Sequence, residues 1–307
     1  MRLLLLFLLL AASASAQTTG IASRYPRDRG IRFDPDVLLA DDFESYTSTA
    51  QLTINWSGVG PVQNMRIATE PGNFFSGGAA LEMKLPVSSH GVTDLLRKRF
   101  SAGHDVVFIR TYCKFDPLYH LPGGNHNGMR LSAKYPGPGT KSPADGTGFF
   151  LFLLQNTFLN LQGEIDPGYT HIYAYWPRQR SSFGDHWYPT GFVVPQSKVG
   201  DKGDWLAYPN QYPDFKPYPN FIPQRGRWYC YELMVKANTP GARNGEVKGW
   251  INGNVAFDFP DLFMRSINTL KIDEAFIVLG AGHSQRVNKK WYDNVVIATK
   301  YIGPMRP

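Results

Sequence analysis

The feature that most constrains the fold is a series of short segments in which apolar and polar residues alternate, with Gly, Pro and Asn between them. Alternation of this kind places every second side chain on one face of a β-sheet, whereas apolar residues at helical spacing hardly persist beyond about ten positions anywhere in the chain. We therefore expect an all-β protein. The predicted strands cover residues 79–85, 105–115, 148–154, 171–175, 228–236, 246–251, 275–279 and 292–297.

Two Asn-Gly pairs, Asn244-Gly245 and Asn252-Gly253, flank the predicted strand 246–251. Because Asn-Gly favours the tight turns of β-hairpins, both pairs are predicted to be turns of an antiparallel meander. Many short strands without intervening helices favour two stacked sheets. The sequence predicts a β-sandwich of the jelly-roll type.

The first residues have the pattern of a secretory signal peptide. Arg2 precedes an apolar run over 3–10, and the small residues Ala14-Ser15-Ala16 follow it. We predict a signal peptide over 1–16 and a single domain over 17–307, secreted to the extracellular space or the periplasm. No later apolar run reaches the roughly 20 residues of a membrane helix, so no membrane association is expected.

The predicted mature chain is basic. The whole chain has 32 Lys and Arg and 25 Asp and Glu. Removal of the signal peptide takes away one of the basic residues, Arg2, so the net charge of the mature chain is +6 with His neutral. The basic residues are dispersed, so we expect no nucleic-acid partner, and an acidic polysaccharide suits the charge. We expect a monomer.

The chain has two cysteines, Cys113 and Cys230, each within a predicted strand. An oxidising compartment allows them to form one disulfide, and a core of this size does not require it. Two cysteines do not form a structural zinc site by themselves. The disulfide is left open by the sequence.

Two short stretches carry the residue types of proton-transfer chemistry. His120 precedes the Gly-rich run Leu121 to Gly124, and His171, Tyr173 and Tyr175 alternate along a predicted strand. An imidazole that takes a proton and a phenol that returns one are what β-elimination from an acidic sugar requires. Alternatively, the tyrosines are packing partners on one sheet face.

A segment of about fifty residues, 177–226, contains eight prolines and many aromatic side chains but little strand pattern. We expect an ordered flap over a saccharide groove, with Trp187 and Trp205 stacking on sugar rings. The alternative is that these rings only hold the loop against the sandwich.

The chain resembles the jelly-roll polysaccharide lyases, which include alginate and glucuronan lyases and have a concanavalin A-like fold. The resemblance lies in the Leu-Pro-Gly loop at 121–124, the Tyr-x-Tyr strand at 173–175, the Asn-Thr-Pro-Gly turn at 238–241, Trp-Ile-Asn-Gly at 250–253 and Trp-Tyr-Asp-Asn at 291–294. It implies cleavage of a uronate-containing polysaccharide by β-elimination, with His120, Tyr173 and Tyr175 in the catalytic roles.

The sequence departs from these lyases at two places. They have Lys where this chain has His120, and they have Ser-x-Arg on the next strand, where Phe150-Leu151-Phe152 stands here. We expect Arg130 to offset the substrate carboxylate instead. The predicted substrate-binding residues are Asn125, His126, His171, Trp187 and Trp205.

Two other functions remain open. A carbohydrate-binding sandwich without catalysis agrees with the replacement of Lys by His120 and with the absence of Ser-x-Arg. Glu164-Ile165-Asp166 resembles the start of a glycosidase motif, but Pro167-Gly168 interrupts the strand before a second Glu. No cofactor is required for elimination, and a structural calcium is a possible addition at Asp42 and Asp293.

Overall fold

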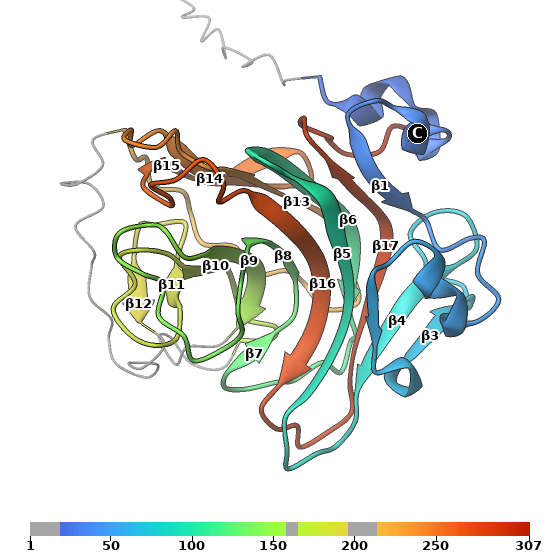
Figure 1. Cartoon of the computed structure of the whole chain (residues 1–307). Coiled ribbons are helices and arrows are strands. Elements are labelled where there is room, and N and C mark those ends of the chain that lie inside the picture. The colour runs from blue at the N-terminus through green and yellow to red at the C-terminus, as the bar shows by residue number, and fades with distance from the viewer. Residues whose placement is uncertain (1–18, 158–164, 196–213) are drawn as a thin grey trace, which may run out of the picture.

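The computed structural model describes residues 19–157, 165–195 and 214–307 (Figure 1). The predicted signal peptide, Trp205 and Glu164 lie outside these ranges. Within them, no helix has both the length and the apolar character needed to cross a bilayer.

Two antiparallel sheets form a sandwich, which confirms the predicted fold class (Figure 1). In the described ranges one sheet has eight strands in the order β15-β14-β13-β6-β17-β4-β3, with β1 paired to β17. The other has nine, in the order β12-β11-β10-β9-β8-β16-β5-β2, with β7 paired to β16. The middle strands of each sheet join distant parts of the chain, as in β13-β6-β17-β4 and β8-β16-β5, which is typical of a jelly roll, whereas β13 to β15 and β8 to β12 follow one another in sequence.

The eight-stranded sheet consists of β1 (Val37–Asp41), β3 (Met65–Ala68), β4 (Ala80–Leu85), β6 (Val106–Phe115), β13 (Tyr229–Lys236), β14 (Gly245–Ile251), β15 (Asn254–Leu262) and β17 (Asn288–Ala298). The nine-stranded sheet consists of β2 (Gly58–Gly60), β5 (Val92–His104), β7 (Asn125–His126), β8 (Met129–Ala133), β9 (Phe150–Thr157), β10 (Tyr169–Tyr175), β11 (Asp185–Trp187), β12 (Val193–Pro195) and β16 (Ile272–Ala281). The helices of the described ranges are short 3₁₀ turns, η1 (Ile21–Arg24), η2 (Pro26–Asp28), η3 (Ile31–Phe33), η4 (Thr49–Ile54) and η5 (Val62–Asn64).

Strand alternation separates an inner face from an outer face in the nine-stranded sheet. On β9, Phe150, Phe152 and Leu154 belong to the main core between the sheets. Leu151 and Leu153 belong to a second apolar cluster, together with the tyrosines of β10. That second cluster is the floor of the outer face, where the candidate site lies.

The turns around β14 agree with the prediction at one end only. Asn252 and Gly253, with φ of 49° and 80°, form the tight turn to β15. The expected tight turn at Asn244-Gly245 is wrong, because Gly245 already begins β14. The chain reverses at Pro240-Gly241 instead, where Gly241 has a φ of 84° that favours glycine.

The two cysteines do not form the disulfide that the sequence left open. Cys113 on β6 is paired with Tyr229 on β13, next to Cys230, so successive residues direct the two thiols to opposite faces of the sheet. Both thiols are free and buried, and burial raises the pKa of each. The fold needs no covalent link between these strands.

Candidate active site

The outer face of the nine-stranded sheet brings together several of the predicted site residues. Strand pairing places Arg130 (β8) opposite Leu153 (β9), Leu153 opposite Tyr173 (β10), and Tyr173 opposite His186 (β11). Directly paired residues share one face of a sheet. Arg130 and Tyr173 therefore lie on one face, and Tyr175 joins them because it alternates with Tyr173.

A cavity of about 370 Å³ opens on this face. Its walls include side chains from β7, β10 and β11 and from the loops at 135–138 and 183: His126, Tyr135, Tyr173, Tyr175, Phe183 and His186. An open cavity with aromatic walls and a few polar groups is typical of a saccharide site.

The hydroxyl groups of Tyr173 and Tyr175 are 3.3 Å apart. The backbone N–H of Gly184 donates to the Tyr173 oxygen over 3.1 Å, so the Tyr173 proton is the one given to Tyr175. The Tyr175 oxygen accepts this bond and keeps its own proton as a donor. Burial raises the pKa of Tyr173 far above its ordinary value, so its phenol stays protonated at neutral pH.

His126 lies beside this pair, with its ring centroid 5.0 Å from that of Tyr173. Its Nδ1 is 2.9 Å from Gln155 Oε1, and Gln155 Nε2 is 3.2 Å from His171 Nε2. Burial lowers the pKa of His126 and lowers that of His171 to about 4. Both imidazoles are therefore neutral at neutral pH.

Arg130 is buried, and Glu274 of β16 forms an ion pair with it. Its guanidinium lies 5.0 Å from the centroid of the Tyr135 ring and 3.3 Å from that of Phe276. Burial lowers the pKa of Arg130 to about 10, so it remains a cation at neutral pH. Arg130 reaches the tyrosines through Tyr135, whose ring centroid is 5.2 Å from that of Tyr175.

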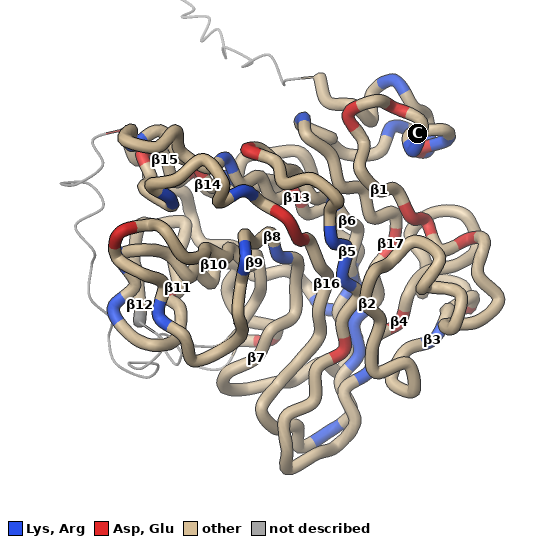
Figure 2. The backbone as a smooth tube through the Cα atoms, viewed as in Figure 1, with Lys and Arg blue, Asp and Glu red and all other residues tan. Residues whose placement is uncertain are grey.

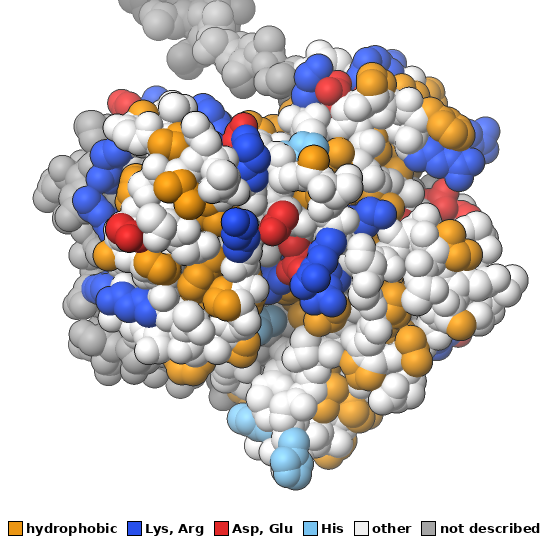
Figure 3. Space-filling model, viewed as in Figure 1, with side chains coloured by type: hydrophobic (Ala, Val, Ile, Leu, Met, Phe, Trp, Pro, Cys, Tyr) orange, Lys and Arg blue, Asp and Glu red, His pale blue; other side chains and the backbone are white. Residues whose placement is uncertain are grey.

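Two arginines of β5 extend the positive charge along the same face. Glu274 also contacts Arg99 at 3.3 Å and Arg97 at 3.8 Å, so three guanidinium groups share one carboxylate. Figure 2 shows basic positions along β5 beside the acidic positions of β16, and Figure 3 shows basic and acidic side chains together near the middle of this face. The surplus of positive charge suits an anionic ligand.

His120 and Asn125 hold the loop between β6 and β8. His120 Nδ1 is 3.0 Å from the carboxylate of Asp166, which also pairs with Arg225 at 3.0 Å. His120 is not among the described residues that line the cavity. Asn125 does line it, but its amide donates to Leu121 O and Gly123 O and so stabilises the Gly-rich loop.

His171 and Trp187 are both completely buried. His171 lies on the site face behind His126 and Gln155, where it supports other residues. Trp187 points the opposite way, into the main core, and its ring packs on Phe152 and Trp176. The prediction that Trp187 stacks on a sugar is therefore wrong. Successive residues of β11 point to opposite faces of the sheet, and of these residues only His186 lines the cavity.

The residues proposed for calcium lie at the first and last strands. Asp293 is buried, and its carboxylate accepts the N–H groups of Phe75 at 2.7 Å, Ser76 at 3.1 Å and Asn294 at 2.7 Å. Amide donors thus face both of its oxygens, an arrangement that does not fit a cation. Within the described ranges, no three His, Cys, Asp or Glu side chains cluster as metal ligands. Asp293 is therefore not a suitable ligand, and a structural calcium elsewhere remains an untested prediction.

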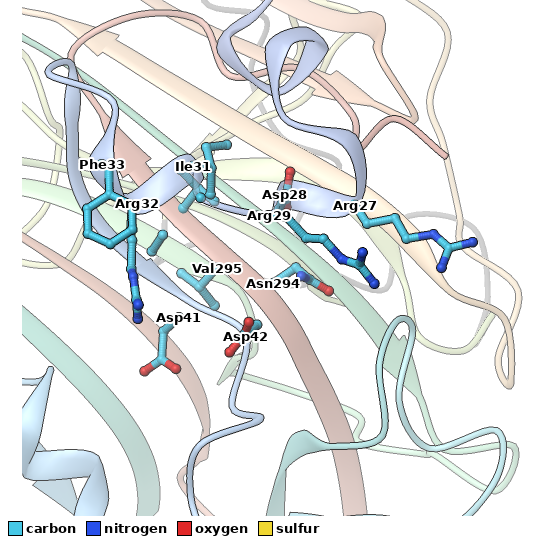
Figure 4. A pocket seen from close by; sticks show the side chains of 13 residues that line it. Arg27, Asp28, Arg29, Ile31, Arg32, Phe33, Asp41, Asp42, Asn294 and Val295 are labelled. Carbon is cyan, nitrogen blue, oxygen red and sulfur yellow. The ribbon is translucent and has the colours of Figure 1, made fainter.

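Asp42 is exposed and lines a separate cavity of about 310 Å³ at the N-terminal segment (Figure 4). Arg27, Arg29 and Arg32 surround the same cavity (Figure 4). It lies against β1 and β17 of the eight-stranded sheet, away from the tyrosines.

Sequence reasoning missed Gln155, His186, Tyr135 and Glu274. Gln155 had one signal, since it alternates with Leu153, which faces outward on β9. His186 had another, since it stands next to Trp187, whose large apolar ring marks the inner face of β11. Glu274 and Tyr135 had none, because their partners come from strands distant in the sequence.

Comparisons with solved structures support the fold. No family model matches the sequence, and no curated protein is detectably similar to it. The fold matches the alginate lyase Aly36B in complex with alginate trisaccharide, with a TM-score of 0.58 and 14% identity over 85% of this chain and 97% of that one. It also matches an alginate lyase from Aplysia kurodai, with a TM-score of 0.57 and 15% identity over 86% of this chain and 99% of the other.

A third match is the endo-β-1,4-glucuronan lyase from the fungus Trichoderma reesei, with a TM-score of 0.51 and 14% identity. It covers 86% of this chain and 95% of the fungal enzyme. At such identities the likeness concerns the backbone alone. The chain has the jelly-roll fold that alginate and glucuronan lyases share.

Proposed function

We propose that this protein is a secreted polysaccharide lyase that cleaves a uronate-containing polysaccharide, such as alginate or glucuronan, by β-elimination. The observation that carries the proposal is one cavity wall on which the neutral imidazole of His126 lies beside the hydrogen-bonded phenols of Tyr173 and Tyr175. A base and an acid within reach of one sugar ring are what this reaction requires.

In the proposed reaction, His126 takes the proton from C5 of the uronate. The electron pair of that C–H bond forms the C4–C5 double bond, the C4–O4 bond breaks, and Tyr175 gives its proton to O4. The phenolate of Tyr175 then regains a proton, and His126 loses the one it took. Arg130 offsets the charge that develops toward the carboxylate.

We assign the base to His126 instead of His120 because of position, and instead of Tyr173 because of protonation state. His126 lines the cavity, whereas the imidazole of His120 contacts Asp166. Tyr173 is a poor base because burial keeps its phenol protonated. A neutral imidazole, by contrast, can accept a proton at neutral pH without help.

The charge of the outer face supports an anionic substrate. Arg97 and Arg99 are partly exposed, with 36% and 66% of their side-chain surface accessible, and lie on the strand next to β16. Carboxylates along a polyuronate would pair with such groups in charge-assisted hydrogen bonds. The structural matches include lyases of two different polyuronates, alginate and glucuronan, and we propose the polyuronates as a class.

A carbohydrate-binding protein without catalysis is the second candidate. Its support is the ion pair of Arg130 with Glu274, which partly neutralises the arginine expected to activate the substrate. In that case the cavity would hold a sugar and release it unchanged.

Incubation of the purified chain with alginate, glucuronan and a neutral glucan tests both candidates. A lyase produces an unsaturated uronate whose conjugated double bond absorbs in the ultraviolet, from an acidic polymer only. Retention of the protein in a gel that contains the polymer, without any such product, would support the binding protein. Neither product nor retention with any acidic polymer would refute both candidates.

A further inference from the structure

A chain of hydrogen bonds behind the cavity begins at a backbone carbonyl. His171 Nδ1 is 2.9 Å from the oxygen of Tyr169. A carbonyl oxygen only accepts, so Nδ1 of His171 must carry the hydrogen. Because His171 is neutral, its Nε2 is a lone pair that can only accept.

This lone pair fixes the direction of the next bond. His186 Nδ1 at 2.8 Å and Gln155 Nε2 at 3.2 Å both face this lone pair and share it. An amide oxygen in the place of Gln155 Nε2 would be repelled by the lone pair, so the nitrogen is the amide atom turned toward His171. Because the amide nitrogen of Gln155 faces His171, the amide oxygen Oε1 faces His126. That oxygen accepts from His126 Nδ1, which therefore carries the hydrogen.

We infer that Gln155 and His171 are positioning residues that hold His126 in the tautomer whose Nε2 is free to take a proton. The inference rests on the proposed function, in which His126 is the base. Among the described residues, none forms a hydrogen bond with His126 Nε2, and the ring lines the cavity. Neither Gln155 nor His171 lines the cavity, so both act through His126.

The direction of the amide group is the critical element. Without the imidazole of His171, no contact at that end of the Gln155 amide would favour the nitrogen over the oxygen. If Gln155 turns over, its Nε2 donates to His126 Nδ1, and the imidazole hydrogen moves to Nε2. The base would then point a hydrogen at the substrate and could not accept a proton.

Among the described residues around His126, none supplies a negative charge that would hold the hydrogen on Nδ1 in place of Gln155. Tyr173 contributes a phenol, His171 a neutral imidazole, and Arg130 a positive charge that lowers the pKa of His126. None of these would restore the Nδ1–H tautomer. The hydrogen-bond chain from the Tyr169 carbonyl is thus the element that selects it.

Nitrogen-15 NMR of the imidazoles tests the inference in the unaltered protein, because protonated and bare ring nitrogens differ widely in chemical shift. We expect His126 to show a protonated Nδ1 and a bare Nε2. The opposite assignment, or an equal mixture of both tautomers, would overturn the inference whether or not the protein is active.

Two variants test the functional consequence. His171→Leu should lower kcat by roughly tenfold to a hundredfold with KM little changed, and should move hydrogen to His126 Nε2. Gln155→Glu in the same background should restore most of kcat, because a carboxylate can only accept and returns the hydrogen to Nδ1. The carboxylate also raises the pKa of His126, so the acidic limb of the pH profile should shift upward.

The matched control is His104→Leu, at the opposite end of β5 from Thr93, which lines the cavity, and it should leave kcat unchanged. If the double variant is no more active than His171→Leu while both remain folded by thermal unfolding, the inference fails. If the NMR shifts are as expected but no acidic polysaccharide is cleaved, the hydrogen-bond chain stands and the proposed function fails.

Discussion

Tyr175→Phe removes a single oxygen atom at the proposed proton donor. The side chain is only 1% exposed, and its ring packs against Tyr135, Tyr173 and Phe149 at centroid distances of 5.2, 5.4 and 6.1 Å. Phenylalanine preserves these contacts. The lost hydrogen bond to Tyr173 is long, at 3.3 Å, so the free energy of unfolding should fall by only about 1 kcal/mol.

The effect on catalysis should be much larger. General acid catalysis contributes roughly a hundredfold to ten-thousandfold to a rate, which corresponds to about 3 to 5 kcal/mol of transition-state stabilisation. Because the phenol donates its proton only as O4 departs, we expect the loss in kcat, with KM almost unchanged. Initial rates of ultraviolet absorbance on a polyuronate, together with retention in a polymer-containing gel, measure the two parameters.

Tyr188→Phe is the matched control. Tyr188 is equally buried, and no residue of the described ranges forms a hydrogen bond with its hydroxyl, so its removal should leave activity unchanged and stability unchanged or slightly higher. If Tyr175→Phe retains kcat within about threefold of the unaltered protein, Tyr175 is not the acid and the proposed chemistry is refuted.

Charged side chains account for the remaining predictions. Arg99→Gln should raise KM for a polyuronate severalfold and weaken its salt dependence, as measured by initial rates at several salt concentrations. Asp28→Ala leaves Arg110 buried without its ion-pair partner and should cost about 3 to 5 kcal/mol in urea unfolding. Burial raises the pKa values of Glu232 and Asp293 to about 7, so the folded state holds protons that the unfolded chain loses near pH 4. Stability should therefore fall as pH rises from about 4 to 7, by on the order of 3 kcal/mol per group, in thermal unfolding at a series of pH values.

Each of these three predictions has a control variant or a result that would contradict it. Lys98→Gln changes the same charge on β5, but Lys98 contacts Asn55 O on the other side of the sheet, so KM should be unaffected. Lys300→Ala breaks an exposed pair with Asp36 and should cost less than about 1 kcal/mol. A loss of similar size for Asp28→Ala would contradict the buried-pair argument. A melting temperature that rises between pH 5 and pH 8 would contradict the assignment of the two buried acids.

The strands that were predicted are those whose side chains alternate between apolar and polar. Residues 105–115, 228–236 and 292–297 coincide with β6, β13 and β17 within a few residues, because each has one face in the main core. β5 was missed because it carries Arg97, Lys98 and Arg99 in succession, so no apolar pattern marks it. Its place comes from pairing with β16.

The candidate site was predicted only in part, for a related reason. Tyr173 and Tyr175 could be assigned to one face because they belong to one strand. His126, Gln155 and His186 come from three other strands, and only the register between strands places them beside the tyrosines. Residue type by itself favoured His120, which the folded chain turns toward Asp166.

The sequence by itself determined the class of fold, since period-two alternation and turn residues are local properties that each segment carries alone. It also determined that Tyr173 and Tyr175 face the same way. Only the tertiary structure decided which histidine joins them, that Arg130 is held by Glu274, and that Trp187 points inward. These outcomes depend on which strands become neighbours, and that choice follows from packing two whole sheets around one core.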